Sequence, residues 1–214
     1  MDTLSHGLWA TVVGKGVNQK STKKIKLGWM AFWGMFPDLF AFIPVIVWML
    51  WQIFFNGVDF DDIPRPETMP PEERNSIYIF RLIQTLYHFS HSIIVFVVIF
   101  FIVAFLYRYI KNADRTSSSP LQYRALRFLP CWSLSGWFIH IIADIPTHTR
   151  DFYPTLFLWP LSDWCYDGSS WGTMRFMLFN YTFLLMFFML FWLRSLISPR
   201  KILLKSKEGK KTSC

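Results

Sequence analysis

The sequence predicts an all-α membrane protein, a polytopic bundle of four transmembrane helices with an N-terminal, partly inserted helix. Of the 214 residues, 53% are hydrophobic and 20% are aromatic. Charged residues make up only 17%, against about 25% in soluble domains. Four segments are long and apolar enough to cross a bilayer, which takes roughly 20 residues. These segments are residues 28–55, 77–107, 128–145 and 174–193.

The N-terminal segment 2–14 is apolar enough to enter a membrane but too short to cross it. We expect a half-helix or a buried amphipathic helix there, ahead of a Lys-rich turn that begins at Lys15. Because the lysines follow the apolar run, the segment is not typical of a cleaved signal peptide. In the first span, Pro37 removes a backbone hydrogen bond just before Asp38. This predicts a broken helix, which at membrane depth is tolerated where it lines a cavity.

The second and third spans each carry a pair of ionisable residues at helical spacing. Residues three or four apart share one face of a helix, so His88 and His91 should point the same way, as should His140 and Asp144. Each pair could chelate an ion. Pro146 should end the third helix near Asp144.

The fourth span, 174–193, completes a single membrane-embedded domain over residues 1–197, and a basic cytoplasmic tail follows over 198–214. The loops between the spans alternate in charge. Residues 1–28, 108–127 and the tail are basic, whereas 56–80 and 146–172 are acidic. Because basic loops stay on the cytoplasmic side, we expect a multi-pass protein of the cell inner (plasma) membrane with both termini in the cytoplasm.

The net charge of +8 does not require nucleic acid as a partner. The basic residues fall where anionic lipid headgroups lie, so the expected partner is membrane lipid. The three cysteines are too few and too scattered for a disulfide framework or a thiolate zinc site. They are Cys131, Cys165 and Cys214.

Ionisable residues inside the apolar segments point to a buried metal site. A charge at the bilayer centre costs about 2.5 kcal/mol or more, so such groups face a cavity, pair with each other or hold an ion. Imidazole nitrogen and carboxylate oxygen are the ligands of zinc, iron, manganese or nickel. Packing roles for the histidines, a helix cap at Asp38 and a structural pair of His140 with Asp144 remain alternatives. The candidates are His6, Asp38, His88, His91, His140, Asp144 and His148, the last on a loop just beyond the third span.

Four short motifs occur in order along the chain. They are Ser5-His6-Gly7, Phe36-Pro37-Asp38, His91-Ser92 and His140-x-x-x-Asp144. This series resembles the bacterial membrane-bound metal-dependent hydrolases of the YdjM-like family, over most of the chain. That family is distantly similar to the helical zinc phospholipase C and S1/P1 nuclease group, which cleaves phosphoesters. The resemblance implies that the metal ligands are His6, Asp38, His91, His140, Asp144 and His148.

These observations predict a membrane-bound hydrolase in which one or two divalent metal ions, zinc foremost, activate water. The expected substrate is a lipid or lipid-linked phosphoester. The predicted catalytic residues are Asp38, Asp144 and His88. Asp38 or Asp144 could bridge two ions, and an unliganded carboxylate or His88 could act as the base. One alternative is a metal-ion or proton transporter, which the near absence of polar residues in the cytoplasmic half of the spans disfavours. Another is a non-catalytic scaffold with a buried metal.

Overall fold

A computed structural model describes residues 1–22, 24–66, 69–114, 131–150 and 153–211, without the side chains of Pro71, 111–114, Cys131 and 198–211. These residues form helices and no strand, which confirms the all-α class. Contacts divide the chain into two units, Met1–Gly172 and Thr173–Cys214. The predicted membrane-embedded domain over residues 1–197 and basic tail over 198–214 stay predictions.

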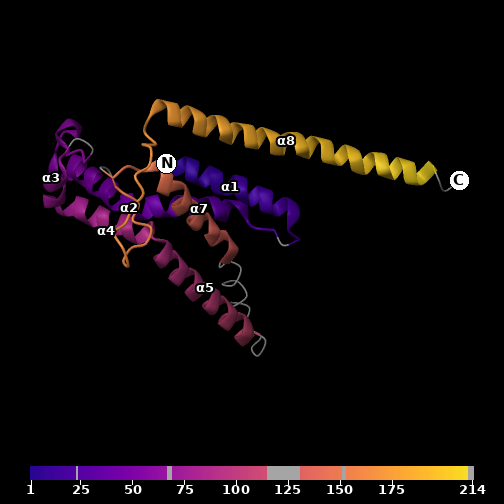
Figure 1. Cartoon of the computed structure of the whole chain (residues 1–214), viewed down its shortest axis with the longest axis horizontal. Helices are drawn as coiled ribbons and strands as arrows, with labels where there is room; N and C mark the ends of the chain where they lie inside the picture. The colour runs from indigo at the N-terminus through magenta and orange to yellow at the C-terminus, as the bar shows by residue number, and fades with distance from the viewer. Residues whose placement is uncertain (23, 67–68, 115–130, 151–152, 212–214) are drawn as a thin grey trace. The chain divides into compact units, whose positions relative to one another are not determined.

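The first unit is built around α2 (Figure 1). Helices α1, α4 and α7 all pack against α2, and α1 also contacts α7. The second unit consists of α8 (Met174–Lys211). The elements of the first unit are α1 (Thr3–Lys20), α2 (Leu27–Asn56), η1 (Phe60–Asp62), α3 (Pro71–Ser76), α4 (Tyr78–Ser90), α5 (Ile93–Asp114), η2 (Cys131–Leu134), α7 (Ser135–Asp144) and η3 (Ile145–Thr147).

Helix α1 begins where Asp2 caps it, with the Ser5 N–H donating to the Asp2 carboxylate over 3.0 Å. It continues to Lys20, past the turn predicted at Lys15. The prediction of a half-helix ending there is therefore too short. Lysines are good helix formers, so a charged residue by itself does not end a helix.

Helix α2 confirms the first apolar segment but not the break expected at Pro37. It runs without interruption through Pro37 and Pro44. The Ser90 hydroxyl donates to the Pro37 carbonyl over 3.1 Å. This bond links α4 to α2 at the proline, and packing against neighbouring helices lets a membrane helix tolerate such a residue.

The second predicted span is two helices instead of one. Helix α4 ends at Ser90, His91 is its C-cap and α5 begins at Ile93. The Ile93 N–H donates to the Phe157 carbonyl over 2.9 Å, and the Ser92 hydroxyl donates to the Trp159 carbonyl. A loop far along the chain thus satisfies the polar groups freed by the break.

The third predicted span is not confirmed as a membrane crossing. Helix α7 covers 10 residues, about 15 Å at 1.5 Å per residue, and the start of the predicted span at 128–130 lies outside the described residues. Its end is as expected, because α7 stops at Asp144, just before Pro146.

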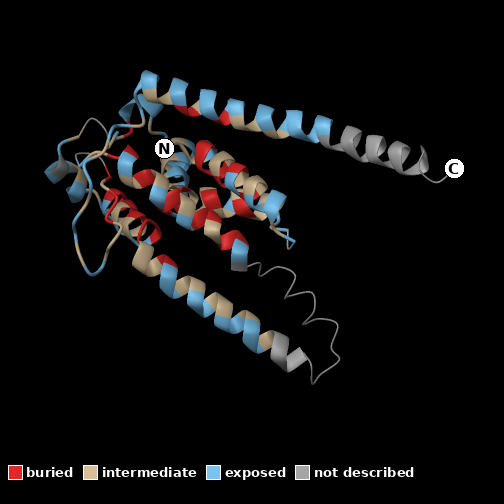
Figure 2. Ribbon diagram, turned by 45° about the vertical axis from the view of Figure 1, so that its right-hand side comes forward, coloured by how far each residue is buried: buried red, intermediate tan, exposed pale blue. Residues whose placement is uncertain are grey.

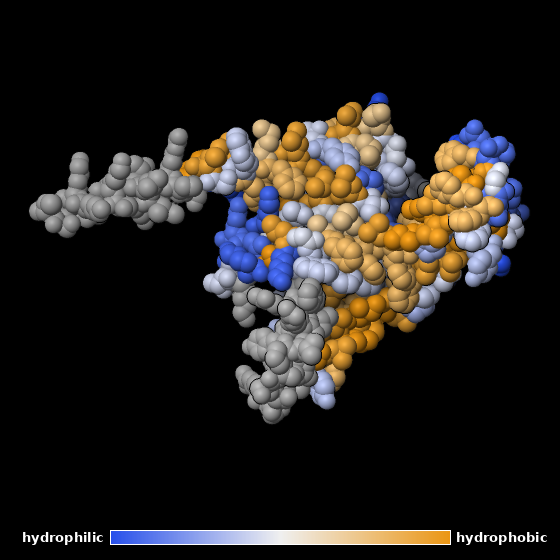
Figure 3. Space-filling model, turned by 180° about the vertical axis from the view of Figure 1, so that it is seen from behind, coloured by the Kyte–Doolittle hydropathy of each residue, from blue (hydrophilic) through white to orange (hydrophobic). Residues whose placement is uncertain are grey.

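Three described helical segments are long and apolar enough to cross a membrane, in α2, α5 and α8. They are Leu27–Asn56, Ile93–Ile110 and Met174–Ile197. Large apolar side chains are exposed along them, among them Phe54, Phe105 and Trp192, and Figure 3 shows apolar residues over much of one face of the molecule. The chain is thus consistent with a membrane protein, although the predicted count of four spans is not confirmed.

Glycines let α1, α2 and α7 approach backbone to backbone, and the buried residues gather on these helices and α4 (Figure 2). A Cβ on Gly34 would lie 2.9 Å from the His6 carbonyl oxygen, and one on Gly136 would lie 2.2 Å from the Met30 carbonyl oxygen. Small residues at helix crossings are typical of membrane proteins. They bring His6, Asp38, His140 and Asp144 towards one another.

We expect Gly136→Ala to lower the free energy of unfolding of the first unit by about 3 kcal/mol. This value is at the upper end of the range that is typical when a side chain is added to a well-packed core. The reason is that backbone atoms of α2 occupy the space a methyl group would need. Thermal unfolding of detergent-solubilised protein measures the effect. Gly28→Ala is the matched control, since Gly28 is also the second residue of its helix and an added Cβ there would meet nothing within 4 Å. Equal melting of both variants would contradict the expectation.

Candidate metal centre

Four side chains from three helices form a buried group that could hold a metal ion. Asp38 comes from the middle of α2, His91 from the C-terminus of α4, and His140 with Asp144 from α7. Each offers one ligand atom, and these atoms all lie within 4.8 Å of one another. His91, His140 and Asp144 are fully buried.

The distances between the ligand atoms fit a small coordination shell. His140 Nε2 lies 2.9 Å from His91 Nε2, 3.1 Å from Asp144 Oδ2 and 3.6 Å from Asp38 Oδ1. His91 Nε2 lies 3.3 Å from Asp144 Oδ2 and 3.5 Å from Asp38 Oδ1. Tetrahedral ligands with bonds of about 2.1 Å stand about 3.4 Å apart, so these spacings suit a single ion between them.

The rings of His91 and His140 each use Nδ1 for a hydrogen bond, so Nε2 is the atom available to bind a metal ion. His140 Nδ1 lies 2.7 Å from the Gly34 carbonyl and His91 Nδ1 lies 3.0 Å from the Tyr87 carbonyl. A carbonyl only accepts, so Nδ1 carries the proton in both rings. Two unprotonated Nε2 atoms then face each other beside two carboxylates. Such a set requires a cation or an added proton at its centre, and orienting bonds of this kind are common around metal-ligating histidines.

A hydroxyl from α1 orients the Asp38 carboxylate. The Thr3 hydroxyl donates to Asp38 Oδ2 over 2.8 Å, which leaves Oδ1 facing the two imidazoles.

The second oxygen of Asp144 faces away from the four-residue group, towards His6 and His148. Asp144 Oδ1 lies 2.9 Å from His6 Nε2 and 3.6 Å from His148 Nδ1. The Met1 amino group donates to the same oxygen over 2.6 Å. The His6 ring also stacks on His140 with the centroids 3.6 Å apart. The structure therefore brings the predicted ligands His6 and His148 next to the group, although outside its four members.

His148 lies beyond α7, where burial lowers the pKa of its imidazole to about 4 against the opposing effect of the Asp144 carboxylate. The ring is therefore neutral at pH 7. Its Nδ1 is 3.4 Å from the Tyr87 hydroxyl, which in turn is 3.2 Å from the Thr155 hydroxyl. The Tyr87 ring stacks on His91 at 3.7 Å, so one tyrosine links both sides of the site.

His88 does not belong to the four-residue group, although its spacing from His91 predicted a pair. It lies within α4, and its Nε2 is buried without a hydrogen-bond partner among the described residues. The expected pairing depended on one continuous helix. His91 is the C-cap of α4 and its N–H still donates to the Tyr87 carbonyl over 2.9 Å, so helical spacing alone did not bring both rings into the group.

A cavity of about 280 Å³ opens beside the metal-ligand group. Aromatic side chains line part of its wall, and the other lining residues are Met1, Asp2, Thr3, Asp38 and His148. The aromatic lining residues are Phe42, Tyr87, Tyr153 and Trp171. A small molecule in this cavity would reach the Asp38 side of the group.

Comparisons with known proteins found no family model, no curated protein and no solved structure that matches the chain.

We expect Thr3→Val to weaken metal binding about 10–100-fold, because loss of a bond that orients a ligating carboxylate typically has an effect of this size. Titration of purified protein with zinc measures the affinity. Thr11→Val is the matched control, since the Thr11 hydroxyl bonds to the Gly7 carbonyl within the same helix. An unchanged zinc affinity in Thr3→Val would show that the hydrogen bond from Thr3 is not required to orient Asp38.

Proposed function

We propose that this chain is a membrane-bound metal-dependent hydrolase of lipid or lipid-linked phosphoesters, as the YdjM-like resemblance suggested. The observation that carries the proposal is the convergence of Asp38, His91, His140 and Asp144 in a buried position beside a cavity. Two nitrogen and two oxygen ligands suit zinc best among the common metals. The other oxygen of Asp144 lies beside His6 and His148 and already accepts a hydrogen bond from the Met1 amino group, so we propose a single ion at the four-residue group.

The residues present fit hydrolysis of a phosphoester. A bound divalent ion lowers the pKa of water towards ~7 and stabilises charge on an attacked phosphoryl group. Asp38 and Asp144 hold the ligand set together, and His148, neutral at pH 7, is placed beside the cavity to accept a proton. The water oxygen forms a bond to phosphorus, the ester P–O bond breaks, and the leaving alcohol oxygen takes up a proton.

A lipid substrate follows from where the site lies. The ligand group is built on helices that include an apolar, membrane-length α2, and aromatic side chains form one part of the wall of the cavity beside it. A water-soluble substrate would have to leave water to reach such a site. A lipid in the same membrane would not.

The test is hydrolysis of a panel of lipids by purified, zinc-loaded protein. The panel contains phosphatidic acid, phosphatidylglycerol and an isoprenyl pyrophosphate, with a carboxyl ester as the comparison. We expect phosphoester cleavage that a chelator stops and added zinc restores. Cleavage of the carboxyl ester alone, or cleavage that survives the chelator, would contradict the proposal.

We further propose the topology expected from the loop charges, with both termini in the cytoplasm of an inner-membrane protein. This topology needs a fourth crossing besides the three membrane-length helices, and we assign it to the predicted span 128–145. In a background without the native cysteines, Asp61→Cys should react with a membrane-impermeant maleimide in intact cells, since Asp61 follows α2 and is exposed. Thr22→Cys, exposed before α2, should react only after permeabilisation. The opposite pattern would invert the proposed orientation.

A further inference from the structure

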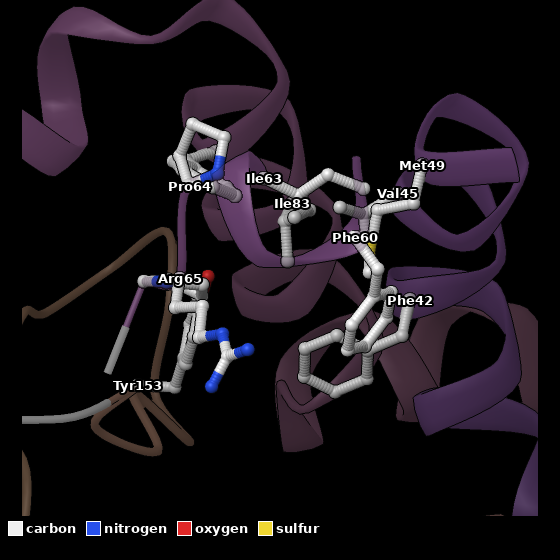
Figure 4. A pocket seen from close by; sticks show the side chains of 11 residues that line it. Phe42, Val45, Met49, Phe60, Ile63, Pro64, Arg65, Ile83 and Tyr153 are labelled. Atoms are coloured by element: carbon white, nitrogen blue, oxygen red, sulfur yellow. The ribbon is translucent and has the colours of Figure 1, made fainter. Parts of the chain in front are cut away.

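A second and larger cavity lies between α2 and α4. Its volume is about 380 Å³, within the range of pockets that bind small molecules. Figure 4 shows side chains of α2, of α4 and of the chain after α2 around it. The lining is apolar apart from one arginine among the described residues, Arg65. Apolar walls with few polar groups are typical of sites for hydrocarbon ligands.

This pocket shares a wall with the cavity beside the metal-ligand group. Phe42 and Tyr153 line both spaces, and their rings meet edge to face with centroids 5.7 Å apart. A ligand with a polar end next to Asp38 therefore has apolar space immediately beyond these two rings.

The cation among the described lining residues lies at one side of the pocket. Arg65 lies beside Tyr153 on one side of the pocket, away from Val45 and Met49 (Figure 4). Its guanidinium is half-exposed and lies 3.4 Å from the Asp61 carboxylate. The other described lining residues of the pocket carry no charged side chain, which suits a hydrocarbon chain.

We propose that the pocket between α2 and α4 binds the hydrocarbon chain of the substrate, while its phosphoryl group lies in the cavity beside Asp38. This assignment rests on the proposed function. Phe42 to Met49 spans about 10 Å along α2 at 1.5 Å per residue, which corresponds to a chain of about octyl length. The substrate is then an anionic phosphoester with one hydrocarbon chain that leaves the bilayer to enter the protein.

Binding of phosphonates, which contain no ester bond to cleave, tests the pocket apart from any turnover. Zinc-loaded protein in nanodiscs is titrated calorimetrically with octylphosphonate, methylphosphonate and octanol. Burial of each methylene is worth about fourfold in affinity, so octylphosphonate should bind at least about 100-fold more tightly than methylphosphonate. Octanol, which lacks the anionic end, should bind less tightly than octylphosphonate.

Two substitutions on α2 distinguish binding in the pocket from binding to the exposed apolar surface. Val45 lines the pocket, whereas Val47, on the same helix, is exposed and does not line it. Val45→Trp should weaken octylphosphonate binding about tenfold or more and leave methylphosphonate binding unchanged. Val47→Trp should change neither. Retained zinc content shows that each variant is folded, and Met49→Phe is a milder filling variant with the same expectation.

Equal binding of octylphosphonate by wild type and both valine variants would overturn the assignment, as would equal binding of octylphosphonate and octanol. Hydrolysis distinguishes this failure from failure of the proposed function. If Val45→Trp weakens octylphosphonate binding but no phosphoester is cleaved, the pocket assignment is supported and the hydrolase proposal is contradicted. If octyl and methyl phosphodiesters are cleaved with the same ratio in wild type and Val45→Trp, the hydrolase stands and the pocket assignment falls.

Discussion

Asp144→Asn is expected to abolish metal-dependent hydrolysis. The amide keeps the shape of the side chain but removes the negative charge that faces His91 and His140 through one oxygen and His6 through the other. The loss of activity should exceed about 100-fold. Substituting a residue that only supports a metal ligand typically lowers activity by about 10–100-fold. The measurement is the chelator-sensitive rate of lipid phosphoester cleavage by purified protein at saturating zinc.

Asp163→Asn makes the same chemical change at an exposed position in the loop before α8. Surface changes away from special features alter free energies by about 0.5 kcal/mol at most, so this variant should keep its rate within about a factor of two. Equal losses in Asp144→Asn and Asp163→Asn would show that Asp144 has no special part in the reaction.

The second large effect is expected from a comparison of the two histidines at the end of α4. His91→Ala removes one of the four ligands and should leave no measurable turnover. His88→Ala should retain most of the activity, because His88 lies outside the ligand group. Both changes delete an imidazole within one turn of chain, so general damage to the end of α4 would lower both rates alike.

This comparison also decides whether His88 is the catalytic base that the sequence predicts. If His88→Ala loses turnover while its zinc content stays at the wild-type level, His88 acts as the base although it lies outside the ligand group. If both variants keep their turnover, the ligand assignment of His91 is wrong.

Much of the site could be predicted from the sequence because the membrane restricts where ionisable residues occur. Asp38, His91, His140 and Asp144 stand out in apolar segments, and burial without a partner is costly there. The structure indeed brings them together from distant parts of the chain. The His140–Asp144 spacing was especially informative, because α7 is helical over both residues and places them on one face.

The break at His91 could not be predicted from hydropathy. Residues 77–107 contain neither proline nor glycine, which are the usual signals for a helix end. The break depends on Phe157 and Trp159, whose carbonyls accept hydrogen bonds from the segment. The serines on either side of His91 are the local feature of the sequence that indicates polar contacts with the backbone.

Glycine spacing is a signal in the sequence that the prediction of the fold did not use. Gly7 and Gly14 of α1, Gly34 of α2 and Gly136 of α7 lie where added Cβ atoms would meet neighbouring helices within 3 Å. These contacts let the 10-residue helix α7 approach α2 closely. Pro37, by contrast, suggested a break that tertiary packing overrides.

The most direct test of the central claim, that Asp38, His91, His140 and Asp144 form a metal centre, is the metal content of the purified protein. Inductively coupled plasma mass spectrometry compares wild type with His140→Ala after identical growth, solubilisation and dialysis. The account predicts near-stoichiometric divalent metal in the wild type and little in His140→Ala. Folded wild-type protein without metal even after zinc addition, or equal metal in both proteins, would contradict it.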